Sequence, residues 1–385
     1  MSGTGRDAAR TRDRAGPVTA DAPRPPRWSP RRKYGVAAVA LAMLAAAGVA
    51  VASQSNPSSV AGGVDVNHLS VGPAPPSLAD AKGWLNTAPL TAADLRGKVV
   101  LYDFWTYSCV NCVRTLPHVR AWFDRYRQDG LVVVGIHSPE FDFEKDHGNV
   151  TSAVQRLHVD YPVALDDNMD IWNAFGTQYW PEEWVSDRQG HLRYMDVGEG
   201  NYQSTEAVLR KLLGVPARAP RAAPPGAGNL GQPPTAAQSV TAETYLGLEK
   251  GATGAQPGPA TYPNVGTLPE GTARLVGAWD ATAQQVQAVA PGAAVVLGYR
   301  ARAVNLVMAA ASAQPVRVDV QLDGKPLPPA ERSPAVQVDA QGRTFLRVST
   351  PDLYPVVLGG RVEGHTLRLT AAGSGVQAFA FTFGA

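Results

Sequence analysis

The sequence of 385 residues contains only two cysteines, Cys109 and Cys112. A pair separated by two residues cannot provide a framework of structural disulfides. A zinc site would need two further Cys or His ligands at suitable spacing, and the seven histidines are scattered along the chain. We therefore expect the pair to act chemically and expect no metal, with a zinc half-site or an inert pair as the alternatives.

A strong charge of either sign is also lacking. The formal net charge is only +2, which is too small to create a strong field over the surface. No basic stripe interleaved with aromatic residues follows residue 33, so nucleic acid is excluded as an expected partner. Apolar residues make up 44% of the chain and spread through two long blocks, which predicts two folded domains rather than wholesale disorder.

Long uncharged apolar runs are scarce, and the one that stands out covers residues 34–52. Before it, residues 1–33 hold nine Arg or Lys against three Asp, a flank typical of the cytoplasmic side of a membrane. We expect 1–33 to be a disordered cytoplasmic tail, 34–52 a single-pass transmembrane anchor, and the remainder to lie outside the cytoplasm. The run only just reaches the roughly 20 apolar residues of a span, so a cleaved signal that yields a secreted protein stays open.

Two stretches rich in Pro, Gly, Ser or Ala predict linkers at 53–75 and 215–240. Between them, residues 76–214 alternate short apolar runs with helical segments, which predicts an α/β domain whose central sheet is covered on both faces. Residues 241–385 contain short alternating runs such as Val316–Leu322 and no amphipathic run of helix length. They predict an all-β, jelly-roll-like sandwich of two sheets.

The surroundings of the cysteine pair predict its chemistry. A buried strand at Val99–Trp105 ends just before Cys109, and a helix interrupted by Pro117 is expected after the pair. Cys109 would then lie at the helix N-terminus, where free N–H groups and the helix dipole favour a thiolate nucleophile. Cys112, one turn further in, is expected to resolve the mixed disulfide. The pair itself is the redox group, so no further cofactor is expected.

The order Asp103-Phe104-Trp105, Cys109-x-x-Cys112, Pro117 resembles the active-site segment of thioredoxins. The resemblance implies a thiol–disulfide oxidoreductase in which a buried Asp103 takes and returns the Cys112 proton. A carboxyl group inside an apolar strand would have the raised pKa that such an exchange needs. The alternative is an Asp103 that faces the surface.

Thioredoxins also keep a cis proline that faces the cysteines, and the matching residue in this sequence is Pro181. The resemblance implies a groove beside Pro181 in which an extended substrate segment pairs with the backbone. Trp180 and Trp105 are expected to line this groove. An ordinary trans loop at Trp180-Pro181 is the alternative.

A narrower resemblance covers nearly all of residues 76–385. An additional strand and helix at 150–165 are typical of the TlpA and ResA-like branch, and several stretches resemble the exported C-terminal region of DipZ-type cytochrome c biogenesis proteins: 104–117, 138–146, 178–181, 243–247, 299–302, 322–324 and 381–384. The resemblance implies disulfide-containing exported proteins as substrates. DipZ proteins carry a CcdA-like electron-transfer domain before this region, so a separate membrane electron donor of CcdA type is expected here.

The second block is likened in that family to carbohydrate-binding modules. An exposed Trp279 or Tyr354 could stack on an envelope glycan, although a tryptophan in a sandwich core is commoner. Two other functions stay open: a redoxin-type thiol peroxidase, which would need a Thr/Arg pair such as Thr106 and the distant Arg193, and a non-enzymatic envelope-binding protein. The favoured interpretation is a membrane-tethered thiol–disulfide oxidoreductase in cytochrome c maturation or envelope disulfide reduction.

Overall fold

The computed structural model describes residues 64–216, 230, 239–251, 253–312 and 314–385. The predicted tail at 1–33 and the predicted anchor at 34–52 lie outside this range, as do parts of both predicted linkers. Within the described ranges, no helix is both long enough and apolar enough to cross a membrane. The described residues build two domains, an α/β domain followed by an all-β domain, and each is treated separately below.

The first domain is built on a six-stranded sheet in the order β1-β4-β3-β2-β5-β6. Strands β2, β3 and β4 are parallel, and the other neighbours pair antiparallel. All seven residues of β2 are buried, because this strand has neighbours on both sides and helices or loops over both faces. The strands are β1 (Gly83–Leu85), β2 (Val99–Trp105), β3 (Leu131–His137), β4 (Val163–Leu165), β5 (Glu182–Ser186) and β6 (Leu192–Val197).

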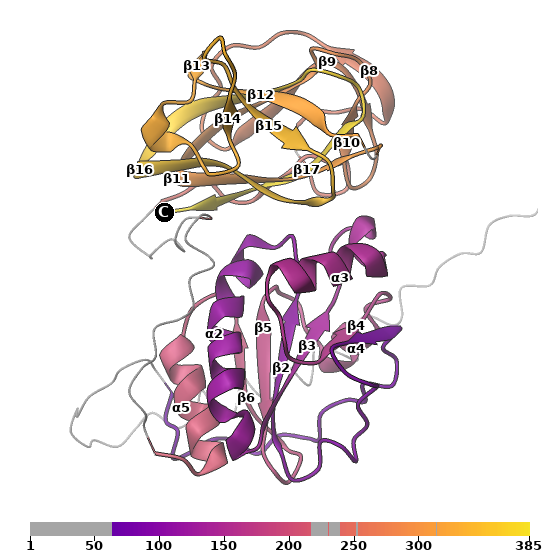
Figure 1. Cartoon of the computed structure of the whole chain (residues 1–385), viewed down its shortest axis with the longest axis vertical. Coiled ribbons are helices and arrows are strands. Elements are labelled where there is room, and N and C mark those ends of the chain that lie inside the picture. Colours follow the sequence, from indigo (N-terminus) through magenta and orange to yellow (C-terminus); the bar gives the residue numbers. More distant parts are fainter. Residues whose placement is uncertain (1–63, 217–229, 231–238, 252, 313) are drawn as a thin grey trace, which may run out of the picture. The chain divides into compact units, whose positions relative to one another are not determined.

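Helices cover both faces of this sheet (Figure 1). On one face, the odd-numbered residues Leu101 and Trp105 of β2 share a core with α2, α3 and α5. On the other face, the even-numbered Tyr102 and Phe104 pack against α4, as the two-residue period of a strand requires. The predicted two-sided covering is therefore confirmed. The helices are α2 (Val110–Tyr126), η1 (Arg127–Asp129), η2 (Asp142–Lys145), α3 (His147–Arg156), α4 (Asp170–Phe175) and α5 (Tyr202–Leu213).

Helix α2 differs from the helix that the sequence predicts. It begins at Val110, directly after the first cysteine, and continues through Pro117 without ending. Proline removes only the one N–H that would bond the carbonyl of Val113. Leu116 and Val119, on either side of the proline, are buried in the domain core, and this burial holds the helix together across it.

The last part of the predicted 53–75 linker packs against the first domain. Gly72 donates its N–H to the carbonyl of Leu192 at 2.7 Å, and Leu192 donates in turn to Pro73 at 2.9 Å. Val66 and Leu69 lie partly buried against the same core that contains β2. The tether therefore ends earlier than the sequence suggested, because residues 64–75 have polar and apolar partners beside β6.

The described residues of the second domain are all β, as predicted, apart from one short 3-10 turn. By hydrogen bonding, its described strands form one continuous sheet of eleven strands rather than two separate sheets. The reason lies in the long strand β11, whose first half pairs with β9 and whose second half pairs with β17. The register shifts between Ala301 and Ala303, where a bulge bends the strand. The elements are β7 (Thr244–Tyr245), β8 (Gly258–Tyr262), β9 (Thr272–Ala281), β10 (Val286–Ala288), β11 (Ala294–Ala310), β12 (Val316–Leu322), β13 (Lys325–Pro326), η3 (Pro329–Glu331), β14 (Gln337–Val338), β15 (Thr344–Val348), β16 (Asp352–Ala371) and β17 (Val376–Gly384).

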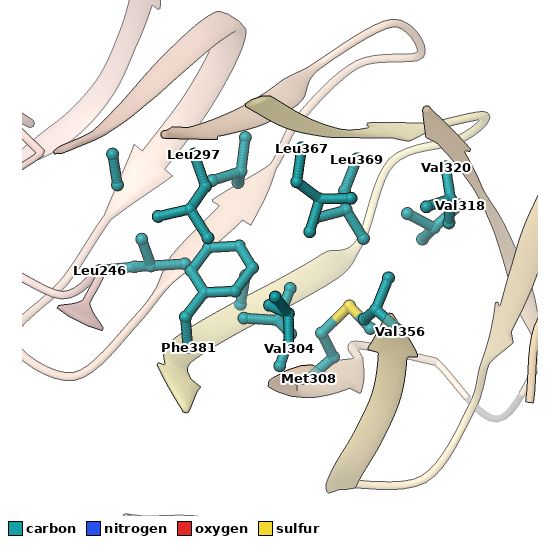
Figure 2. Packing of buried hydrophobic residues seen from close by; sticks show 14 of the residues in the cluster. Leu246, Leu297, Val304, Met308, Val318, Val320, Val356, Leu367, Leu369 and Phe381 are labelled. Carbon is teal, nitrogen blue, oxygen red and sulfur yellow. The ribbon is translucent and has the colours of Figure 1, made fainter. Parts of the chain in front are cut away.

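A large cluster of buried hydrophobic side chains forms the core of the second domain, and Figure 2 shows part of it. Leu297, Leu367 and Phe381 have no exposed surface. Trp279 belongs to the same core, and its indole N–H donates to the carbonyl of Val276 at 2.9 Å. The alternative of an exposed Trp279 that stacks on a sugar is therefore excluded, and the ring fills the core, as is commoner for a tryptophan in a sandwich. Tyr354 is the other aromatic residue that was considered as a sugar-stacking platform.

Truncating a core residue of the second domain should destabilise it strongly. We expect Leu297→Ala to lower the free energy of unfolding by about 2–5 kcal/mol, because a fully buried leucine leaves a cavity. Val338→Ala, at a position with 45% of its surface exposed, is the matched control and should change the same quantity by less than about 0.5 kcal/mol. Urea unfolding of both variants measures the difference, and equal midpoints would contradict the core assignment.

Candidate active site

Cys109 is the N-cap residue of α2. Its backbone is extended, and its own sulfur accepts the N–H of Cys112 at 3.3 Å. A sulfur in this position satisfies a helix N–H that would otherwise lack a partner, and it lies at the positive end of the helix dipole. Both effects are stronger for a thiolate than for a thiol. Cys109 is partly exposed, so it can meet a substrate.

Cys112 lies one helical turn further in and is buried, with 1% of its surface exposed. Burial raises the pKa of its thiol well above the usual value, and the hydrogen bond to Cys109 and the negative charge there raise it further. Cys112 therefore holds its proton at neutral pH. It can act as a nucleophile only when a nearby group takes that proton.

Asp103, in the middle of β2, is the carboxyl group that is suited to take the proton of Cys112. It is 1% exposed, so the alternative of a surface-facing Asp103 is excluded. Burial raises its pKa to about 7, partly offset by the Tyr161 hydroxyl, which donates to Oδ2 at 3.4 Å. The Asp103 charge in turn raises the pKa of Cys112. A carboxyl group that titrates near neutrality can both take and return a proton.

The loop before β5 faces the sulfur of Cys109. The Trp180–Pro181 peptide bond is cis, and the carbonyl oxygen of Trp180 accepts from the Cys109 sulfur at 3.8 Å. The Trp180 indole N–H donates to the carbonyl of Ser138 at 3.0 Å, and its ring lies 4.2 Å from that of Trp172. Trp180 and Pro181 thus form a fixed wall beside the reactive sulfur.

Trp105 does not lie where the sequence interpretation placed it. Its side chain has no exposed surface, and it packs edge-on against His137 with ring centres 5.3 Å apart. A Cβ atom at position 135 would lie only 2.9 Å from the indole nitrogen of Trp105, so the ring occupies space that the glycine leaves open. The expectation that Trp105 touches the substrate is corrected: its ring faces the α2 side of the sheet and fills the core below the cysteines.

Two acidic residues near the site were not singled out from the sequence. Glu144, in η2, is fully buried; it accepts from the Ser108 hydroxyl at 2.6 Å and from the N–H of Phe141 at 3.0 Å. It thereby ties the residue before Cys109 to the loop that follows β3. The second, Glu183, pairs directly opposite Asp103 in the sheet. Acidic residues in short elements normally face water, so the sequence contains no direct sign that Glu144 and Glu183 are buried. The only signal was that both lie beside motif residues.

The pair needed for a peroxidase does not assemble at Cys109. Thr106 is buried, with its hydroxyl 3.3 Å from Nε2 of His137. Arg193 forms an ion pair with Asp187 at 2.7 Å, at the turn between β5 and β6. That turn follows the end of β5, whereas Pro181 lies just before its start, so Arg193 is at the opposite end of the strand pair. The geometry therefore favours dithiol chemistry over peroxide activation.

The sequence of the first domain is similar to those of known redox proteins. The family described as Redoxin matches residues 71–213. The thiol-disulfide oxidoreductase YkuV of Bacillus subtilis is 31% identical over 139 residues, which cover 36% of this chain and 93% of YkuV. A thioredoxin-like protein solved in its oxidised form is 30% identical, covers 37% of this chain and 97% of that one, and superposes with a TM-score of 0.34. On the match to YkuV, the chain belongs to the thioredoxin-like thiol–disulfide oxidoreductases.

The resemblance to DipZ is also confirmed. Protein DipZ of Mycobacterium bovis is 36% identical over 324 residues, which cover 80% of this chain and 42% of DipZ. The family described as thioredoxin-like C-terminal domain matches residues 241–384, so the similarity extends through both domains. The chain spans about two fifths of the length of the DipZ relatives that it matches.

Proposed function

We propose that this protein is a membrane-tethered oxidoreductase that reduces disulfides of exported proteins outside the cytoplasm. The observation that carries the proposal is the arrangement at the start of α2. A partly exposed Cys109 caps the helix with its sulfur, and a buried Cys112 and a buried Asp103 lie behind it. This arrangement gives each of the three groups a separate chemical task.

The reaction has two sulfur transfers. The Cys109 thiolate attacks one sulfur of the substrate disulfide, the substrate S–S bond breaks, and the leaving thiolate takes a proton from water. Cys112 then loses its proton to Asp103 and attacks the Cys109 sulfur. The mixed disulfide breaks, the second substrate sulfur leaves as a thiolate that takes a proton from water, and a Cys109–Cys112 disulfide remains. Two electrons pass to the substrate, so each turnover requires a dithiol reductant.

The DipZ likeness supports a proposal for the reductant and for the role of the protein. A membrane electron donor of CcdA type would reduce the Cys109–Cys112 disulfide by the reverse exchange and become oxidised itself. General reduction of envelope disulfides is the role that this chemistry supports, and cytochrome c maturation is its narrower form. A glycan partner for the second domain has weaker support, since Trp279 is buried in the core.

The tether predicts where the redox domain lies. The nine basic residues of 1–33 before the uncharged run 34–52 favour an extracytoplasmic domain. Protease added to intact spheroplasts should digest the domain that contains Cys109 while a cytoplasmic marker stays whole. Recovery of the domain from the medium would indicate a cleaved signal instead. Complete protection, in cells where a known exported protein is cut, would reverse the topology.

A further inference from the structure

A second buried carboxyl group lies beside Asp103. Glu183 in β5 is the direct cross-strand partner of Asp103 in β2, and residues paired in this way project from the same face with Cβ atoms about 4.5–5.5 Å apart. Glu183 is 4% exposed, and neither of its carboxylate oxygens makes a hydrogen bond of normal geometry among the described residues, the Thr205 hydroxyl giving only a weaker interaction. A buried carboxylate without such a bond is costly, so this position calls for a chemical explanation.

The row continues into the next strand. Asp196 in β6 is the direct cross-strand partner of Glu183, and it accepts from Nδ2 of Asn201 at 3.0 Å. The exposed fraction rises along the row from 1% at Asp103 through 4% at Glu183 to 9% at Asp196. Because β6 is the edge strand of the sheet, the row leads from beneath the cysteines toward the edge of the domain.

The groups that face Glu183 come from several elements. The charged neighbours are Asp103 of β2 and Asp196 of β6, and both are negative. Burial raises the pKa of Glu183 well above its usual value, and these two charges raise it further, while the Thr205 hydroxyl of α5 lowers it. Three phenol groups lie close enough to sense its charge: Tyr161, Tyr194 and Tyr202. Closely spaced carboxyl groups cannot all ionise at once, so they hold protons in common.

We propose that Glu183 shares the Cys112 proton with Asp103, and that Asp196 connects this carboxyl pair to solvent. The inference rests on the proposed function and deepens its second step. As Cys112 attacks the mixed disulfide, its S–H bond breaks and the proton moves to Asp103. The O–H bond at Asp103 then breaks as one forms at Glu183, and the proton passes to Asp196 and water. No electrons move in the relay. Glu183 acts through Asp103, so it is a positioning residue.

The test is the pH dependence of resolution in single turnovers. The reduced full chain is mixed with an insulin-type disulfide and quenched with acid, and formation and release of the mixed disulfide are followed separately from pH 5 to 9. Glu183→Gln should move the midpoint of release to lower pH by about one unit or more, because a like charge beside Asp103 is gone. Asp196→Asn should produce a smaller shift in the same direction, since it removes a charge one strand further away. Formation should change by less than about twofold in both variants, because neither residue touches Cys109.

Asp187→Asn is the matched control. Asp187 is a buried carboxyl group at the far end of the same hairpin, bonded to Arg193, and its replacement should leave the midpoint in place. A midpoint for Glu183→Gln equal to that of the unmodified protein, or an equal shift in Asp187→Asn, overturns the inference. If Glu183→Gln does not fold, the shift in Asp196→Asn decides alone. Failure of the unmodified protein to form any mixed disulfide would instead sink the proposed function.

Discussion

Replacing Cys109 by alanine is expected to abolish disulfide reduction, lowering it to the rate measured without protein. Cys109 is the sulfur that caps α2 and is partly exposed, whereas Cys112 is 1% exposed and holds its proton. The buried thiol therefore cannot replace the missing one. Cys112→Ala should keep the first attack and lose the second, so it should accumulate a mixed disulfide with the substrate. Insulin-type reduction measures turnover, and mass spectrometry of acid-quenched samples measures the adduct.

Ser152→Ala serves as the control for these two variants. Ser152 is exposed on α3, and its hydroxyl bonds only the helix carbonyl of Gly148, so its loss should leave turnover unchanged. Full activity in Cys109→Ala would contradict the assignment of the nucleophile. A Cys112→Ala protein that turns over normally without an adduct would contradict the assignment of the resolving thiol.

Replacing Asp103 by asparagine should separate the two chemical steps. The substitution keeps the shape of the side chain and removes the proton acceptor. Release of the mixed disulfide should therefore slow by about 10²-fold or more near neutral pH, the usual contribution of general base catalysis. Formation should change little, because it depends on Cys109. Acid-quenched single turnovers resolve both steps, and wild-type rates for both across acid to neutral pH would make Asp103 a structural residue.

The same variant should change how stability depends on pH. The pKa of Asp103 is about 7 in the folded protein against 3.8 as the ordinary value. Between these values the folded state holds more protons than the unfolded state, so the free energy of unfolding falls as pH rises through this window. The loss amounts to about 4 kcal/mol at 1.36 kcal/mol per pKa unit. Asp103→Asn should remove this pH-dependent loss. The free energy of unfolding of the variant, relative to that of the unmodified protein, should therefore increase from pH 4 to pH 8. Urea unfolding at both pH values measures the change.

Much of the redox domain could be predicted because its signals are local. The run Val99–Trp105 is a strand with those bounds, since six of its seven positions are apolar or aromatic and suit a strand buried on both faces. The placement of Cys109 at a helix N-terminus also follows from the order of strand, cysteine pair and helix. Asp103 is buried as expected, because a residue in the middle of such a strand has no route to water.

What the sequence did not reveal depends on contacts between distant segments. Trp105 is buried because both faces of β2 are covered, and only the packing decides that the odd-numbered residues face α2. Glu183 meets Asp103 because β5 pairs with β2 in one register, across a separation that no local pattern encodes. The continuous sheet of eleven described strands in the second domain likewise results from the pairing of β11 with both β9 and β17, which alternation alone cannot predict.

The central claim is that Cys109 and Cys112 form one reversible redox couple. The full chain, equilibrated with mixtures of reduced and oxidised glutathione, should be quenched with acid and its free thiols alkylated. As the fraction of oxidised glutathione rises, we expect both cysteines to become protected from alkylation together. The change should follow a single transition with the two-electron dependence of an intramolecular disulfide. Two thiols that stay alkylated at every glutathione ratio, or that change independently of one another, would contradict the account.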